Sequence, residues 1–499
     1  MWVMDAADSG KVSWVLAISG GPSQVPLGFH PLAEEWRNIA DREAAVGIVP
    51  GQPILISPGL VDYRLGDYFR DAYPSDRTST ALTYAKELRT WFTFLGTQDV
   101  EWFEAQHSHV RAFQIWRVYD SGNPKLVSPA TWNKGWAALR HFYEWTTKEG
   151  WTEHNPAGNA DRLLDPGTVG GHREKNARTS RDRWITPGEY AMWRDVGLRG
   201  YDAQRDGTGR IVAGLPNVAA RSRNTARNVA FADYLVTTGL RLDEAGKLLV
   251  FEPGTTLQEE VPIVGKGRVR RHYRVMNDLG LASLHQYTVG ERADAIRRAQ
   301  AAARYAEVKG RLDIVEVLQS RSGQRVRLTD GRVLSVETMT ARVRASLYLV
   351  KDQQLEPAWL WLKEDGSPLQ TASWDKVFDT ANDRVTASRT LLGAVSPTVK
   401  VTPHSLRFTF ALFVLLAGIR AIDDHLGFDD ASPFTVMNYA QAFDEVRDLL
   451  GHSSVETTKR VYLEPVKGLR RSSLLRGASV EQMWDQVSAT NPLIGFHTS

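Results

Sequence analysis

The chain of 499 residues carries 61 Lys and Arg against 58 Asp and Glu, which gives a formal net charge of +3. This length allows roughly two to four domains, and the small net charge neither requires nor excludes a nucleic-acid partner. The absence of cysteine excludes disulfides, thiolate zinc sites and cysteine nucleophiles.

The N-terminal residues lack the basic and then apolar pattern of a signal peptide. The longest apolar run, Phe408–Ala417, is too short for a helix that spans a bilayer. We therefore expect a soluble, cytoplasmic protein without a membrane segment. Residues 1–75 contain short apolar pieces separated by glycine and proline, and we expect a small accessory region there.

Between residues 76 and 157 the apolar positions recur with the period of an α-helix. We expect one helix that ends near Gly96, a second over Trp102–Tyr119 and a third over Ser128–Lys148. The third carries several aromatic side chains, which at helical spacing are typical of a core rather than of a platform for base stacking. These residues predict a compact helical domain.

Residues 158–185 have the composition of a linker, with glycine and proline followed by a basic run. Two interpretations of the run are open: a solvated linker, or a strap whose cations follow a DNA backbone. Its candidate DNA-binding residues are Arg173, Lys175 and Arg178. A capping box at Thr186-Pro187-Gly188-Glu189 then predicts the first helix of a new domain.

An apolar helix over Phe231–Thr238 is predicted to end at Gly239. The turn places Arg241 at the start of the next helix, with Glu244 three residues later. An arginine beside a turn is most often a surface residue, so this pair alone does not define a site.

Two predicted strands, 261–264 and 269–275, are joined by Gly265-Lys266-Gly267-Arg268, a strong hairpin pattern. A lysine at such a tip is usually solvated, but it can also reach into a groove. Positive charge is concentrated on this hairpin, and its candidate DNA-binding residues are Arg268, Arg270 and Arg271.

Residues 281–350 are charged and predicted to be helical, above all over 291–311, with a hairpin over 325–333. Residues 359–362 are predicted to form a strand and 373–385 a helix. Farther on, Thr402 and Pro403 predict a helix start, and the spacing puts His404 and Arg407 on one face of that helix. The same segment contains Leu450-Gly451-His452 and closes on Tyr462.

In chain order these motifs are Gly-Leu-Arg-x-x-Glu, Gly-Lys-Gly on a hairpin, His-x-Leu-Arg, Leu-Gly-His and a tyrosine. This order resembles the tyrosine recombinase (phage integrase) family over residues 186–465. The helical domain, with Asn155-Pro156-Ala157 at its exit, is similar to the core-binding domain of that family.

The resemblance implies a mainly α fold with a small β-sheet or hairpin in an α+β catalytic domain, preceded by an all-α core-binding domain, the two forming a C-shaped DNA clamp. The implied domains are an accessory region at 1–75, a core-binding domain at 76–157, a basic linker at 158–185, a catalytic domain at 186–475 and a C-terminal helix or tail at 476–499. Insertions are expected near 290–350 and 418–446.

The resemblance also implies the site residues. The catalytic set is Arg241, Lys266, His404, Arg407, His452 and Tyr462, with Glu244 supporting the first arginine. Two guanidiniums can clamp a phosphate through paired donors. A tyrosine whose ordinary pKa is ~10 needs nearby cations to act as a nucleophile. In this scheme His404 is the candidate acid or base, Lys266 protonates the departing 5′ oxygen, and His452 binds the phosphate.

The expected product is a 3′-phosphotyrosyl link, formed without metal, ATP or another cofactor. The implied protein is a site-specific DNA recombinase of bacterial, archaeal or phage origin. It would bind double-stranded DNA as a dimer on each site and work as a homotetramer across two sites, with accessory directionality or DNA-bending proteins as further partners. A type IB topoisomerase-like relaxase and a non-catalytic DNA-binding protein with the same fold remain alternatives.

This chain departs from the family pattern in two places. Tyr462 follows His452 by ten residues, one more than the commonest spacing, and one residue corresponds to about 100° of helix. The stretch between Gly418 and Val446 is an acidic insert, which is more typical of a solvated loop than of a metal site. Beyond the nucleophile, a stripe at Val480, Met483, Trp484 and Val487 predicts a helix that either packs within its own domain or links subunits.

Overall fold

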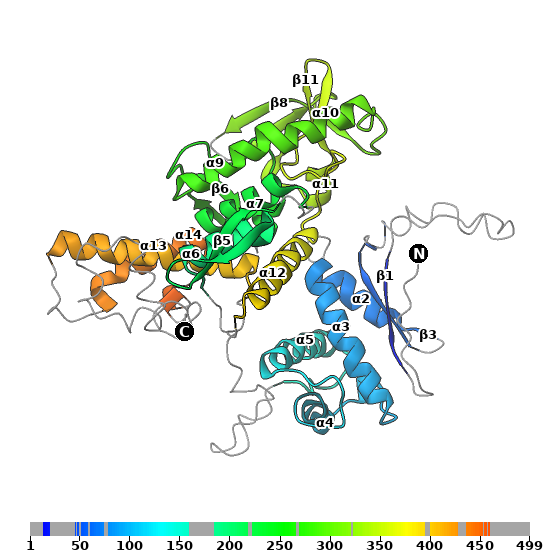
Figure 1. Ribbon diagram of the computed structural model, residues 1–499. Coiled ribbons are helices and arrows are strands. Elements are labelled where there is room, and N and C mark those ends of the chain that lie inside the picture. The colour runs from blue at the N-terminus through cyan, green and yellow to red at the C-terminus, as the bar shows by residue number, and fades with distance from the viewer. Residues whose placement is uncertain are drawn as a thin grey trace. The chain divides into compact units, whose positions relative to one another are not determined.

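The computed structural model describes residues 13–19, 45, 47–48, 51–57, 60–73, 78–158, 184–217, 222–265, 269–320, 323–394, 400–427, 436–452, 454–456 and 458–459. The chain divides into two compact units, 1–180 and 181–499. Both are mostly helical with small sheets (Figure 1), as the sequence predicts.

Unit 1 consists of helices and one small antiparallel sheet with strand order β1-β2-β3. Its elements are β1 (Val15–Ile18), β2 (Pro53–Ser57), β3 (Leu60–Val61), α2 (Tyr63–Ala72), α3 (Thr78–Gly96), the 3-10 turn η2 (Trp102–Glu104), α4 (His107–Val118) and α5 (Pro129–Lys148). The second predicted helix is divided, because Ala105 and Gln106 are extended between η2 and α4.

Aromatic side chains fill the core of unit 1, as predicted. The phenol of Tyr143 accepts a hydrogen bond from Trp91 Nε1 at 2.9 Å and donates to the carbonyl of Trp102 at 2.8 Å. Trp14, just before β1, and Leu55, in β2, belong to the same core. The hydrophobic core therefore extends into residues that precede 76.

Unit 2 begins at the predicted capping box, where the side chains of Thr186 and Glu189 each accept from the other's backbone N–H. Its first half contains α6 (Pro187–Met192), the π-turn η3 (Trp193–Leu198), β4 (Tyr201–Arg205), β5 (Ile211–Pro216), α7 (Thr225–Thr238), α8 (Leu242–Gly246), β6 (Val261–Val264), β7 (Arg270–Tyr273), α9 (Asp278–Tyr287), the π-turn η5 (Thr288–Arg292) and α10 (Ala293–Ala301). Strands β6 and β7 pair antiparallel from Val261↔Tyr273 to Val264↔Arg270, which confirms the hairpin.

The second half contains β8 (Leu312–Ser320), β9 (Gly323–Leu328), β10 (Val333–Ser335), η6 (Val336–Thr338), α11 (Ala341–Ala345), β11 (Leu347–Lys351), β12 (Gln354–Pro357), α12 (Ser373–Leu391), α13 (Pro403–Leu426), η7 (Val436–Tyr439) and α14 (Ala440–Leu450). Helix α13 packs against α14 and against α7 of the first half.

A five-stranded sheet of order β10-β9-β8-β11-β12 occupies much of the region for which we predicted charged helices. The predicted hairpin over 325–333 is present as β9 and β10. The predicted helix over 291–311 is wrong beyond Ala301, because Ala303 has a positive φ of 53° and ends it. Residues 359–362 form isolated bridges rather than a strand. Figure 1 shows α10 beside this sheet.

Helix α13 is longer than its apolar run suggests, because Gly418 stays helical and the helix continues to Leu426. By length and composition it could cross a membrane, with a mean hydropathy of 1.7 over the tested window, which corrects our expectation that no segment is long enough. However, 67% of that window is buried inside the protein, where α13 packs against α14. The acidic insert therefore begins as a core helix rather than as a loop.

Candidate active site

The turn between α7 and α8 places Arg241 beside α13. Gly239 ends α7 with a φ of 63°, in the left-handed region that favours glycine. A Cβ at this position would also collide with the ring of Phe410 in α13. The glycine thus allows the turn to approach α13 closely, and Arg241 follows at the start of α8.

Glu244 is buried and binds two arginines. One carboxylate oxygen accepts from Arg241 Nη1 at 2.8 Å, and the other accepts from the Arg241 backbone N–H at 2.8 Å and from Arg271 Nη2 at 2.6 Å. Burial favours the neutral acid, but the charges of Arg271, Arg407 and Arg241 and the Arg241 N–H outweigh it and hold the pKa of Glu244 below its usual value. The carboxylate is therefore ionised and fixes Arg241, whose side chain is 32% exposed.

Arg407 connects the two loops that carry other site residues. Its side chain is buried, and it donates through Nη1 to the carbonyl of Gly239 and through Nη2 to the carbonyl of Leu450. Gly239 lies two residues before Arg241, and Leu450 lies two residues before His452. One guanidinium from α13 thus holds both segments in place.

His452 follows α14 through Gly451, which has a φ of 62°. Its Nδ1 lies 2.9 Å from the hydroxyl of Thr458. Burial, and then the charges of Arg407, Arg241, Arg271 and His404, lower the pKa of His452 to about 4. The imidazole is therefore neutral at neutral pH and suited to bind through a neutral ring nitrogen.

His404 lies in the first turn of α13, exposed, with its ring centroid 4.5 Å from that of Phe408. The charges of Arg241, Arg407 and His404 act on His452, and those of Arg241 and Arg407 act on Glu244. The structure thus brings together four of the six predicted catalytic residues, Arg241, His404, Arg407 and His452. Lys266 and Tyr462 lie outside the described residues. The residue before the lysine, Gly265, packs on Glu244, since a Cβ there would lie 2.8 Å from Oε1 of that carboxylate.

The predicted DNA-binding residues have different outcomes. Arg173, Lys175, Arg178 and Arg268 lie outside the described residues. Arg270 is 68% exposed and paired with Glu337 at 2.7 Å. The prediction for Arg271 needs correction: its side chain is 5% exposed and is bound to Glu244 and to the carbonyl of Leu449, so it is not a surface cation of the hairpin. Strand alternation could have indicated this, because Arg271 shares a face of β7 with the buried Tyr273.

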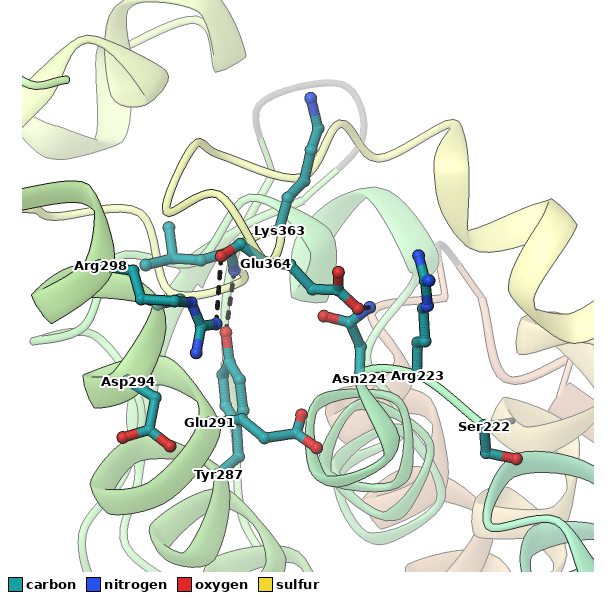
Figure 2. Close-up of a pocket in the computed structure, with 11 residues that line it drawn as sticks. Ser222, Arg223, Asn224, Tyr287, Glu291, Asp294, Arg298, Lys363 and Glu364 are labelled. Carbon is teal, nitrogen blue, oxygen red and sulfur yellow. Dashed lines mark hydrogen bonds between the residues drawn. The ribbon is translucent and has the colours of Figure 1, made fainter. Parts of the chain in front are cut away.

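A separate cavity of about 400 Å³ opens beside the N-terminus of α7 (Figure 2). Its polar groups already serve the fold: Glu291 accepts from the backbone N–H groups of Ala226 and Arg227, and Asn224 donates to Glu364. Cations and acids line it together, and none of the predicted site residues is among them. Across the described part of the chain, no group of three or more His, Cys, Asp or Glu side chains is arranged to hold a metal ion.

Fold and site together define a mostly helical protein of two units, the second of which gathers arginine and histidine side chains around two glycine turns. Residues 68–150 match the family "Phage integrase, N-terminal SAM-like domain". This match confirms the resemblance to the tyrosine recombinase (phage integrase) family and locates the family's helical domain in unit 1.

Solved structures add distant similarity. The Tn1549 transposon integrase in complex with circular intermediate DNA is 13% identical, with 80% of this chain and 94% of that chain covered and a TM-score of 0.40. The XerH site-specific recombinase bound to palindromic difH substrate is 14% identical, with coverages of 81% and 80% and a TM-score of 0.41. A lambda integrase dimer bound to a COC′ core site is 11% identical, with coverages of 84% and 98% and a TM-score of 0.40. No curated protein matches the sequence.

Glu244→Ala is expected to lower the free energy of unfolding by about 3 kcal/mol, because it leaves the buried Arg271 without its carboxylate partner. Chemical denaturation of the full chain measures this loss. The matched control is Asp243→Ala, which removes an acid that is 70% exposed and paired with Lys247, and it should cost less than about 1 kcal/mol. Equal losses in the two variants would contradict the assignment.

The lowered pKa of His452 predicts that acid destabilises the protein. In the unfolded chain this histidine takes up a proton below its ordinary pKa of 6.5, whereas in the folded protein it does so only near 4. Its contribution to stability is therefore present above pH 6.5 and lost as the pH falls toward 4. Denaturation at about pH 7.5 and pH 5 should show a smaller difference for His452→Asn than for the wild type, and an unchanged difference would contradict the burial of a neutral imidazole.

Proposed function

We propose that this protein is a site-specific DNA recombinase, or integrase, which cuts and rejoins DNA strands through a 3′-phosphotyrosyl intermediate. The observation that carries the proposal is the pair of hydrogen bonds from Arg407 to the carbonyls of Gly239 and Leu450. They hold the Arg241 turn and the His452 turn against one helix, so residues far apart in the sequence share one cationic site.

That site suits the transfer of a phosphodiester to an alcohol. Arg241 and Arg407 would bind the non-bridging oxygens and stabilise the charge that grows on them in the transition state. His452, neutral because burial and neighbouring cations lower its pKa, would donate a hydrogen bond to the same phosphate. His404 would act as acid or base at the mouth of the site.

The bonds and protons exchanged in the covalent step all belong to protein side chains and DNA. Tyr462 gives its phenolic proton to His404, and its oxygen forms a bond to phosphorus while the bond from phosphorus to the 5′ oxygen breaks. Lys266 supplies the proton to that leaving oxygen. Attack by a 5′ hydroxyl then reverses the step and reseals the strand, so the energy of the broken bond stays in the phosphotyrosyl link.

For the assembly, we propose a cytoplasmic protein whose two units clamp duplex DNA in a C shape, as a dimer on each site and a tetramer across two sites. Accessory proteins that bend DNA or set direction are further proposed partners, and the basic linker with Arg173, Lys175, Arg178 and Arg268 would follow the DNA backbone. The exposed Arg270 would join them by exchanging Glu337 for a phosphate.

A pool of nicked duplexes drawn from the DNA that flanks the gene tests the proposal. In such suicide substrates a short 5′ fragment diffuses away after cleavage and traps the adduct. Wild-type protein is expected to form a link to DNA that survives denaturation, at one defined sequence. Relaxation of any supercoiled plasmid by a monomer would indicate a type IB topoisomerase-like enzyme instead, and specific binding without an adduct would indicate a non-catalytic DNA-binding protein.

A further inference from the structure

Arg271 joins three segments of unit 2. It is the second residue of β7, the hairpin strand that follows Lys266, and its side chain is buried. Its Nη2 donates to Glu244 of α8 at 2.6 Å, and its Nη1 donates to the carbonyl of Leu449 at the end of α14 at 2.5 Å. One guanidinium therefore connects the hairpin strand β7 with α8, which follows Arg241, and with α14, which precedes His452.

Two buried arginines hold the C-terminus of α14 between them. Arg271 binds the carbonyl of Leu449, and Arg407 binds the next carbonyl, that of Leu450. The last carbonyls of a helix lack partners within the helix, and cations stabilise them. These two contacts fix where the helix stops and hence where the following turn presents His452.

The turn at Gly451 packs against the aliphatic part of the Arg271 side chain. A Cβ added to Gly451 would lie 2.5 Å from Cδ of Arg271, which is closer than two carbon atoms can pack. On its other side Arg271 occupies the oxygen of Glu244 that Arg241 Nη1 does not use. A displacement of Arg271 would therefore move both Glu244, which binds Arg241, and the turn that carries His452.

From these contacts we infer that Arg271 is a positioning residue, which aligns Arg241 and His452 with each other without touching the DNA. The inference rests on the proposed function, because it concerns the alignment of that reaction. A buried side chain that binds only protein groups should affect the rate of the chemical step and leave DNA affinity unchanged. A DNA-contacting arginine would do the reverse, and its loss would reduce the salt dependence of binding.

The first test is Arg271→Lys, which keeps the positive charge but loses the two guanidinium donors that bind Glu244 and the carbonyl of Leu449. With the nicked duplex that wild-type protein attacks, the single-turnover rate of adduct formation at saturating DNA is expected to fall about 100-fold, as for a displacement near 1 Å. The dissociation constant and its salt dependence should stay within about twofold of wild type.

Arg292→Lys is the matched control. Arg292 is a buried arginine of the same unit that donates to the carbonyls of Pro357 at 2.6 Å and Leu360 at 3.2 Å, neither of which is a predicted site residue. It should lower thermal stability in the same way and leave the adduct rate near that of the wild type. An equal loss of rate in both lysine variants would mean that stability alone is responsible, and it would overturn the inference.

A second pair of variants perturbs Arg271 without replacing it. Gly451→Ala pushes a methyl group against Arg271. Gly427→Ala strains a helix end with nearly the same φ of 63°, but no atom of the described residues lies within 4 Å of its Cβ. Only Gly451→Ala is expected to slow adduct formation, again with unchanged affinity for DNA, and equal rates in the two alanine variants would overturn the inference.

A wild-type protein that forms no adduct would overturn the proposed function itself, whereas normal rates in Arg271→Lys and Gly451→Ala would overturn this inference alone.

Discussion

Tyr462→Phe is expected to abolish the covalent protein–DNA adduct, with a fall in its rate of formation of at least about 10⁴-fold. The variant loses the oxygen that attacks phosphorus, and a phenylalanine ring offers no other nucleophile. The two arginines and His452 are untouched, so DNA binding should remain at the wild-type level. The measurement is the single-turnover yield on the nicked duplex after denaturing electrophoresis.

Tyr439→Phe is the control, because Tyr439 is the nearest alternative nucleophile in the sequence. In the structure its side chain is fully buried, and its hydroxyl donates to Asp423 at 2.6 Å. This tyrosine serves the packing of η7 against α13, so its replacement should cost stability and leave the adduct intact. An adduct that persists in Tyr462→Phe and disappears in Tyr439→Phe would exchange the two assignments.

The parts of the site that the sequence predicted are those fixed by local chemistry. The helix end at Gly239 can be predicted because a left-handed C-terminus favours glycine. The capping box of Thr186 and Glu189 can be predicted because its two hydrogen bonds span only three residues. The β6–β7 hairpin follows from two short strands around a glycine-flanked tip. In each case the interacting groups are close in the chain.

What the sequence did not predict depends on contacts between distant residues. The sequence predicts a surface cation at Arg271, because its partners, Glu244 and the carbonyl of Leu449, lie 27 and 178 residues away. Likewise, β8 pairs in parallel with β11, and a parallel pairing leaves no turn pattern between its strands. The extension of α13 to Leu426 depends on packing against α14, which outweighs the breaker tendency of Gly418.

The hydrogen bonds of Arg407 lead to the second large effect. Arg407→Lys keeps the positive charge, but one ammonium cannot reach the carbonyls of Gly239 and Leu450 together while also presenting paired donors to a phosphate. We expect the adduct rate to fall about 10³-fold. The free energy of unfolding should fall by about 2 kcal/mol, because a buried carbonyl loses its donor.

Arg292→Lys separates these two effects. Arg292 is also a buried arginine that donates to backbone carbonyls, those of Pro357 at 2.6 Å and Leu360 at 3.2 Å, but it lies away from the site. Its lysine variant should lose similar stability and keep the wild-type adduct rate. If Arg292→Lys slowed the reaction as much as Arg407→Lys, the loss would reflect a loosened fold. If Arg407→Lys left the rate unchanged, the guanidinium would have no part in binding the phosphate.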